Sequence, residues 1–141
     1  NSNFKNIKLN SKIQEGLIDT DNTKFEWRDI ADFELLESLI FVRNGELVLD
    51  GKLKINIKDY DEMYKFLLTP KNYRNKINQI DFNYTYNFDQ KIATLKDIII
   101  DNKINQNVNR ILSNVFFKKD DLKNKIYFKN LLNEAIKTYA G

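Results

Sequence analysis

A turn signal followed by a long alternating segment constrains the fold of this chain more than any other feature. Asn44-Gly45 is the dipeptide that favours a type I′ turn between two antiparallel strands. Pairing residue 43 with residue 46 sets Val42 opposite Leu47 and Ile40 opposite Leu49. After this turn, apolar residues recur on one parity, and polar or charged residues dominate the other parity. The apolar set is Leu47, Leu49, Leu53, Ile55 and Ile57. The pattern predicts one strand of about a dozen residues with a continuous apolar side, longer than the usual strand.

Asp50-Gly51 offers a second possible turn within this segment, but the register argues against it. Closing a hairpin there would pair Leu49 with Lys52 and would mix apolar and charged side chains on one face. We therefore expect the strand to run through Gly51. A glycine inside a strand is typical of a bulge or of a site where another backbone approaches closely.

The rest of the chain divides into a strand-rich part and a helical part. Alternation predicts strands, and a period of three to four residues predicts helices. Asp59 or Asp61 caps the first helix, and Gly16 marks a turn. Residues 30–37 fit either a helical turn or an irregular strand. The expected strands are 7–13, 23–28, 46–57, 79–88 and 91–101, and the expected helices are 60–68, 104–116 and 128–139.

These elements predict a single α+β domain over residues 1–141. We expect an antiparallel sheet of about five to seven strands with three helices, the last two of them C-terminal. A chain of 141 residues is the usual size of one domain. Residues 1–101 are strand-rich and residues 102–141 form a helical tail. The chain begins with Asn1 rather than Met, so we expect it to be a piece of a longer protein.

The composition excludes several kinds of active site. The chain contains no histidine and no cysteine, which removes thiol chemistry, zinc bound by those residues, and histidine-based triads. Its four glycines form no phosphate-binding loop. We therefore expect a non-enzymatic protein without a cofactor. Calcium or magnesium bound by oxygen ligands alone stays open.

The apolar side of the sheet is the main candidate for binding. It has two interpretations, either an ordinary core covered by the helices or an open groove that holds acyl chains. The sequence does not decide between them. The residues concerned are Phe25, Trp27, Leu47, Leu49, Leu53, Ile55 and Ile57.

Charge is unevenly distributed along the chain. Residues 102–141 carry a net charge of +5, whereas residues 1–101 carry −2. The basic tail is therefore where an anionic group would approach, although a solvated helical face is the simpler interpretation. The candidate contacts to an anionic head group are Lys118, Lys119, Lys125 and Lys129.

A row of alternating aromatic residues suggests a third class of partner. Phe82, Tyr84, Tyr86 and Phe88 share one parity, and Tyr73, Arg74 and Lys76 precede them. Aromatic rings beside basic residues can bind single-stranded nucleic acid by base stacking. The same row also fits a strand face packed on helices, and its half of the chain is net negative. Nucleic-acid binding is therefore the less favoured interpretation.

Several segments together resemble the C-terminal region of AsmA-like bacterial envelope proteins, which are related to β-groove lipid transporters. The segments are Asn6–Leu9, Gly16, Thr23, Trp27, Phe41–Leu53, Leu67–Lys71, Arg74, Ile77, Ile80, Ile100–Lys103 and Asn107. The resemblance rests on the spacing of the strand segments and on short motifs that contain glycine. The chain departs from the family pattern in its three helical segments, which are more than a β-sheet groove alone would contain.

The resemblance implies a large protein that is anchored in the inner membrane of a double-membraned bacterium and lies mostly in the periplasm. Its apolar groove would pass phospholipids toward the outer membrane, without catalytic residues. We therefore expect a non-enzymatic domain in phospholipid transport and outer-membrane biogenesis. The alternatives are a structural or protein-interaction module that binds through an exposed strand edge, and a single-stranded nucleic-acid-binding domain.

Overall fold

A computed structural model describes residues 4–8, 12–14, 16–113, 117–118 and 124–141. Its strands are β1 (Phe4–Lys8), β2 (Lys12–Gln14), β3 (Leu17–Asp19), β4 (Lys24–Trp27), β5 (Ala31–Arg43), β6 (Glu46–Ile57), β7 (Gln79–Asn87), β8 (Ile92–Ile100), β9 (Lys103–Ile104) and β10 (Phe117–Lys118). Its helices are α1 (Tyr60–Leu67), the short 3₁₀ helix η1 (Lys71–Tyr73), α2 (Gln106–Ser113) and α4 (Lys125–Ala140).

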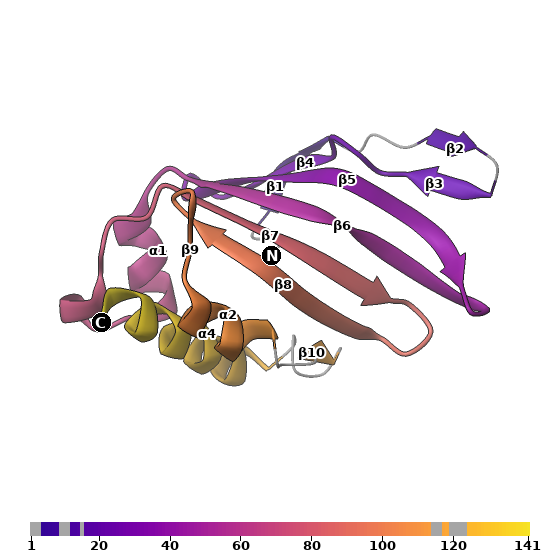
Figure 1. The fold of residues 1–141 in the computed structure, drawn as a ribbon. Coiled ribbons are helices and arrows are strands. Elements are labelled where there is room, and N and C mark those ends of the chain that lie inside the picture. The colour runs from indigo at the N-terminus through magenta and orange to yellow at the C-terminus, as the bar shows by residue number, and fades with distance from the viewer. Residues whose placement is uncertain (1–3, 9–11, 15, 114–116, 119–123) are drawn as a thin grey trace.

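The strands form one antiparallel sheet (Figure 1). The main path runs in the order β1-β4-β5-β6-β7-β8-β10, while β2, β3 and β9 pair beside it. Three α-helices accompany this sheet in the described part of the chain, and the last two are C-terminal. The predicted α+β class, antiparallel sheet and helix placement are confirmed. The main path has seven strands, within the predicted five to seven. The three strands beside it are only two or three residues long, and the sequence pattern did not predict them as separate strands.

The β5–β6 hairpin has the predicted turn and register. Asn44 and Gly45 have φ angles of 54° and 79°, as a type I′ turn requires. Val42 lies opposite Leu47, and Ile40 lies opposite Leu49. β6 continues unbroken to Ile57, so the prediction of one long strand through Gly51 is confirmed.

The close approach predicted at Gly51 is also present, but the bulge lies on the neighbouring strand. Two residues of β5, Glu37 and Ser38, face the single residue Gly51 of β6. Glu37 has a φ of 50°, and its N–H donates to Asp21 Oδ1 at 2.8 Å. The N–H of Thr20 donates to the carbonyl of Ser38 at 2.9 Å. The turn before β4 therefore fixes the bulge.

Of residues 30–37, which were ambiguous in sequence, 31–37 belong to the strand β5, and Ile30 lies in the turn before it. This segment pairs with β4 on one side and β6 on the other, so pairing decides its conformation. The expectation of a half-buried strand near the N-terminus is wrong for Ile7, which is 62% exposed. The β1–β4 register shifts between Lys5 and Lys8, and Asn6 has a φ of 52°. This irregularity removes Ile7 from the buried face.

Helix α1 follows β6 directly and is capped by Asp59. The Asp59 carboxylate accepts from the N–H of Glu62 at 3.0 Å, which decides between the two predicted caps. The helix ends at Leu68, whose φ of 58° gives a left-handed C-cap. The chain then passes Pro70 into η1.

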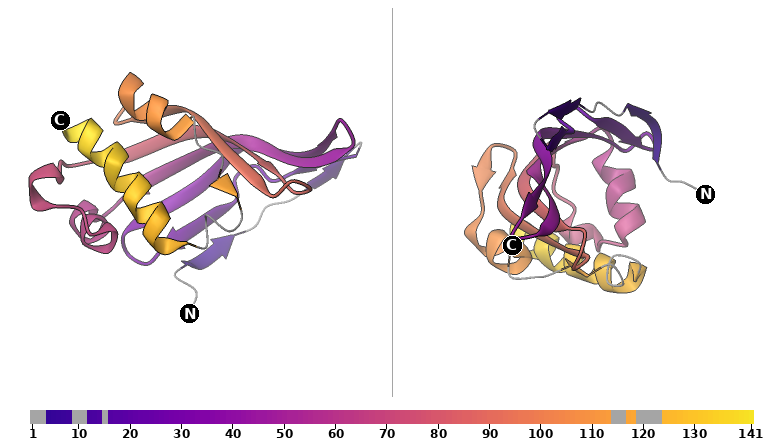
Figure 2. Two further views of the ribbon diagram at one scale, coloured as in Figure 1. Left: turned by 90° about the horizontal axis from the view of Figure 1, so that it is seen from below. Right: turned by 90° about the vertical axis from the view of Figure 1, so that its right-hand side faces the viewer.

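The helices cover one end of the sheet and form the core there. Figure 2 shows α1 and α4 on the side toward which the sheet bends. The tips of the β5–β6 and β7–β8 hairpins extend beyond the helices (Figure 1). Burial of apolar residues at the covered end stabilises the fold. The buried cluster comprises Ile30, Ala31, Met63, Tyr64, Leu67, Ile77, Ile98, Ile100, Val108, Leu112 and Ala135.

Candidate functional site

The apolar side of β6 has a helix-covered half and a half that extends beyond the buried core. Ile55 and Ile57 pack against the buried cluster. Leu53 is half-buried and pairs with Phe82 of β7, which also packs against that cluster. Ile55 and Ile57 therefore contribute to the core, and Leu53 lies beside it through its pairing with Phe82.

The two candidate lipid-facing residues on β4, Phe25 and Trp27, pack against other aromatic rings. The Trp27 ring meets Phe66 of α1 edge-on, with centroids 5.0 Å apart. The Phe25 ring stacks on Phe33, also at 5.0 Å. Both side chains are half-buried. These contacts give both residues a packing role.

Beyond Gly51, toward the hairpin tips, the apolar side is more exposed. Val42 is 64% exposed, Leu47 41% and Phe88 38%. Tyr86 pairs with Leu49 and with Ala93, so four adjacent strands contribute to one apolar surface. We call this surface the distal face. Its members are Ile40, Val42, Leu47, Leu49, Tyr86, Phe88 and Ala93.

A side-chain bridge over Gly51 marks the boundary of the distal face. Tyr84 lies opposite Gly51, and its hydroxyl is 2.9 Å from Ser38 Oγ. Burial raises the pKa of Tyr84, the hydrogen bond with Ser38 opposes this shift, and the charge of Asp50 adds to it. The phenol is therefore neutral at pH 7. The lack of a side chain on Gly51 makes room for Ser38. A glycine within a strand predicts a close approach, but the sequence does not show that Ser38 is the residue that approaches.

The basic residues proposed from the sequence have different surroundings. Lys118 is exposed on β10 and pairs with Ile92 of β8, so strand alternation places it on the side of the sheet opposite Ala93 and the distal face. Lys125 is exposed at the start of α4. Lys129 is half-buried, and its Nζ lies 4.5 Å from the centroid of the Phe66 ring, so it serves packing. Lys119 lies outside the described residues.

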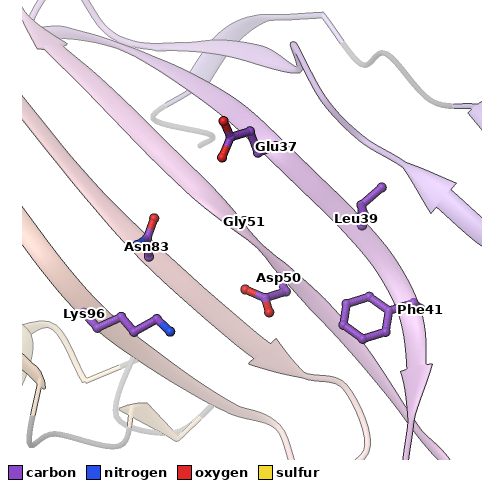
Figure 3. A pocket seen from close by; sticks show the side chains of 7 residues that line it. All are labelled: Glu37, Leu39, Phe41, Asp50, Gly51, Asn83 and Lys96. Carbon is purple, nitrogen blue, oxygen red and sulfur yellow. The ribbon is translucent and has the colours of Figure 1, made fainter.

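The opposite, polar side of the sheet carries an open cavity of about 400 Å³ (Figure 3). Several of its polar groups already have partners: Arg43 pairs with Asp50 at 3.1 Å, and the Asn83 amide donates to Asp97 at 2.9 Å. This mixed-charge hollow lacks the continuous apolar lining of a lipid site. It is lined by Glu37, Leu39, Phe41, Asp50, Gly51, Asn83 and Lys96.

The described residues form no metal centre. No group of three or more aspartates and glutamates in the described ranges is arranged to hold an ion, which leaves the oxygen-only metal interpretation without a site there. Tyr64 is fully buried, and burial raises its pKa to about 12. Its hydroxyl donates to the carbonyl of Asn75, so this perturbed group has a structural role. No helix among the described residues is long and apolar enough to cross a membrane.

The groups that suggested nucleic-acid binding contact other parts of the protein. Arg74 Nε donates to the carbonyl of Thr69 at 2.8 Å, and Arg74 Nη1 lies 3.8 Å from Asp61. The Nζ of Lys137 lies 5.6 Å from the Tyr73 ring centroid. These contacts favour a structural role for the arginine and the tyrosine.

Comparisons of this chain with protein-family models, with curated proteins and with solved structures found no match.

Proposed function

We propose that this chain is a non-enzymatic lipid-binding domain whose distal face receives a hydrocarbon chain. The observation that carries the proposal is the exposure of Val42, Leu47 and Phe88, at 64%, 41% and 38%, on one face of adjacent strands. Contiguous exposed apolar surface is a common mark of a binding site.

The size of the hydrophobic effect supports a single acyl chain as ligand. Each methylene removed from water contributes about 0.8 kcal/mol. Burial of about ten methylenes would contribute about 8 kcal/mol before the costs of association are subtracted. Since about 8 kcal/mol corresponds to a micromolar Kd before these costs, subtracting about 4 kcal/mol or more for association gives an affinity in the millimolar range.

The resemblance to AsmA-like envelope proteins motivates phospholipid as the ligand. On this proposal the chain belongs to a larger protein anchored in the inner membrane of a double-membraned bacterium. The domain would lie in the periplasm and take part in phospholipid transport toward the outer membrane. The polarity of β6 supports this proposal, since its apolar side carries Leu47 and Leu49 while the other side carries charges such as Lys52 and Lys54, with Val48 as its one apolar residue.

Partner binding through a strand edge has less support. All residues of the edge strand β1 are exposed, but its pairing with β4 is interrupted between Lys5 and Lys8. Lysines and bulges on an edge disfavour the addition of another strand. An interaction module that binds a protein on the distal face is therefore the second candidate, because such a face fits apolar side chains as well.

Two matched aspartate variants test the proposal. Leu47→Asp places a charge on the distal face, whereas Leu39→Asp places one on the polar side at similar exposure, 38% against 41%. Native mass spectrometry after incubation with phosphatidylglycerol should show lipid bound to the parent and to Leu39→Asp, with at least about tenfold less on Leu47→Asp. Lipid-free parent protein, or equal binding by both variants, would contradict the proposal.

A further inference from the structure

The first turn of α4 carries two exposed apolar side chains. Ile126 is 74% exposed and Tyr127 is 40% exposed. The position of this turn is well defined, because the Asn124 side chain accepts from the N–H of Tyr127 at 3.1 Å. Asn124 is therefore the N-cap, and both apolar residues lie on an ordered helix.

Packing of α4 on the core does not explain why the first turn carries apolar residues. The helix contacts the core through a stripe of residues that recur at helical spacing. At roughly 100° per residue, Ile126 lies on the opposite side of the helix from this stripe. Its side chain therefore points away from the protein. The stripe comprises Leu131, Leu132, Ala135, Ile136 and Tyr139.

The charge around this turn is positive. Lys125 precedes Ile126 and is exposed. No acidic residue lies in the first turn of α4, and residues 102–141 carry a net +5 against −2 for the rest of the chain. An exposed isoleucine and tyrosine beside an exposed lysine, in a basic part of the chain, form a combination that binds the interface of an anionic bilayer.

We propose that the first turn of α4 docks on an anionic phospholipid bilayer, with Ile126 and Tyr127 entering the interface and Lys125 near the head groups. The proposal does not depend on lipid binding by the distal face. It concerns a different surface and a different form of the lipid.

Vesicle flotation tests the proposal with the intact chain. Vesicles of phosphatidylcholine with phosphatidylglycerol should bind the parent, and vesicles of phosphatidylcholine alone should bind it at least about fivefold more weakly. The double variant I126N/Y127N should bind the anionic vesicles at least about tenfold more weakly than the parent. Lys125→Glu should weaken binding about fivefold or more and reduce its salt dependence.

Leu68→Asn is the matched control. Leu68 is also 74% exposed, and its left-handed φ of 58° suits asparagine. This variant should bind vesicles like the parent, and circular dichroism should show that all variants are folded. A parent that does not bind anionic vesicles, or an I126N/Y127N variant that binds equally well, would overturn the docking proposal.

The two lipid proposals fail in different ways. A chain that captures single lipids in native mass spectrometry but does not bind vesicles retains the distal-face site and loses the docking surface. A chain that binds vesicles through Ile126 but captures no lipid loses the distal-face site and retains the docking surface. Equal binding to neutral and anionic vesicles would contradict the role of Lys125.

Discussion

Replacing Gly51 by alanine tests the packing that separates the covered sheet from the distal face. A Cβ atom at position 51 would lie 2.8 Å from both Cα and Cβ of Ser38, and nearer still to its Oγ. Real Cβ atoms essentially never approach other atoms that closely. The Cα of Ser38 belongs to the backbone of the β5 bulge, so a rotamer change cannot remove the conflict. The two strands must move apart.

The expected cost combines three effects. Forcing a methyl group into a packed position costs about 1–3 kcal/mol. Displacement of Ser38 also weakens its hydrogen bond with Tyr84, which contributes about 1 kcal/mol. The lower backbone freedom of alanine in the unfolded chain offsets about 0.4–1 kcal/mol. We therefore expect Gly51→Ala to lower the free energy of unfolding by about 1–3 kcal/mol.

Urea unfolding followed by the fluorescence of Trp27 measures this change, because the chain has one tryptophan and its ring packs against Phe66. Adding Ser38→Gly to Gly51→Ala should restore part of the loss, because it removes two of the three nearest atoms. Gly45→Ala is the control: its φ of 79° makes it strained, but no atom lies within 4 Å, so Ser38→Gly should not rescue it. A Gly51→Ala protein as stable as the parent would refute the reasoning.

Two further predictions concern stability. The pKa of Tyr64 is raised to about 12, so deprotonation is less favourable in the folded protein than in the unfolded chain, where the pKa is about 10. The contribution of Tyr64 to the free energy of unfolding should therefore be constant below pH 10 and fall between pH 10 and 12. Urea titrations of Tyr64→Phe should show a smaller fall over this range, and an unchanged profile would contradict this origin. Asn133 joins α4 to the end of α1, since its amide donates to the carbonyl of Leu67 at 2.7 Å and its Oδ1 accepts from the hydroxyl of Thr69. Asn133→Leu should lower the free energy of unfolding by about 1–3 kcal/mol in thermal melts, and a stability equal to the parent's would show that these bonds contribute nothing.

The sheet could be predicted where local chemistry and register agree. Asn44-Gly45 defines its own turn, and only one register keeps Leu47 and Leu49 on the apolar face. The same argument carried the strand through Gly51. These features depend on residues close in sequence, which is why they could be found without the structure.

Features that depend on distant contacts were missed. The bulge lies at Glu37 because Asp21, sixteen residues earlier, accepts from its N–H. Ile7 fits the alternation of a half-buried strand, but a register shift in β1 leaves it exposed. The sequence pattern contains no sign of either event.

The extent of helix coverage was also beyond the sequence. Leu47 and Ile57 are equivalent in the alternation, yet Ile57 packs against the core and Leu47 is 41% exposed. The helices cover only the end of the sheet that carries Ile57, and their placement depends on contacts between distant residues such as that of Asn133 with Leu67. Lys129 likewise contacts Phe66, whereas its charge alone suggested a head-group contact.

Methyl NMR with a spin-labelled phospholipid tests the central claim most directly. The label is placed on the acyl chain, and signal broadening reports which side chains it approaches. We predict strong broadening at Val42 and Leu47 of the distal face and little at Ile57, which packs against the core. Broadening at Ile57 with none at Leu47, or no broadening at any methyl group, would contradict the account.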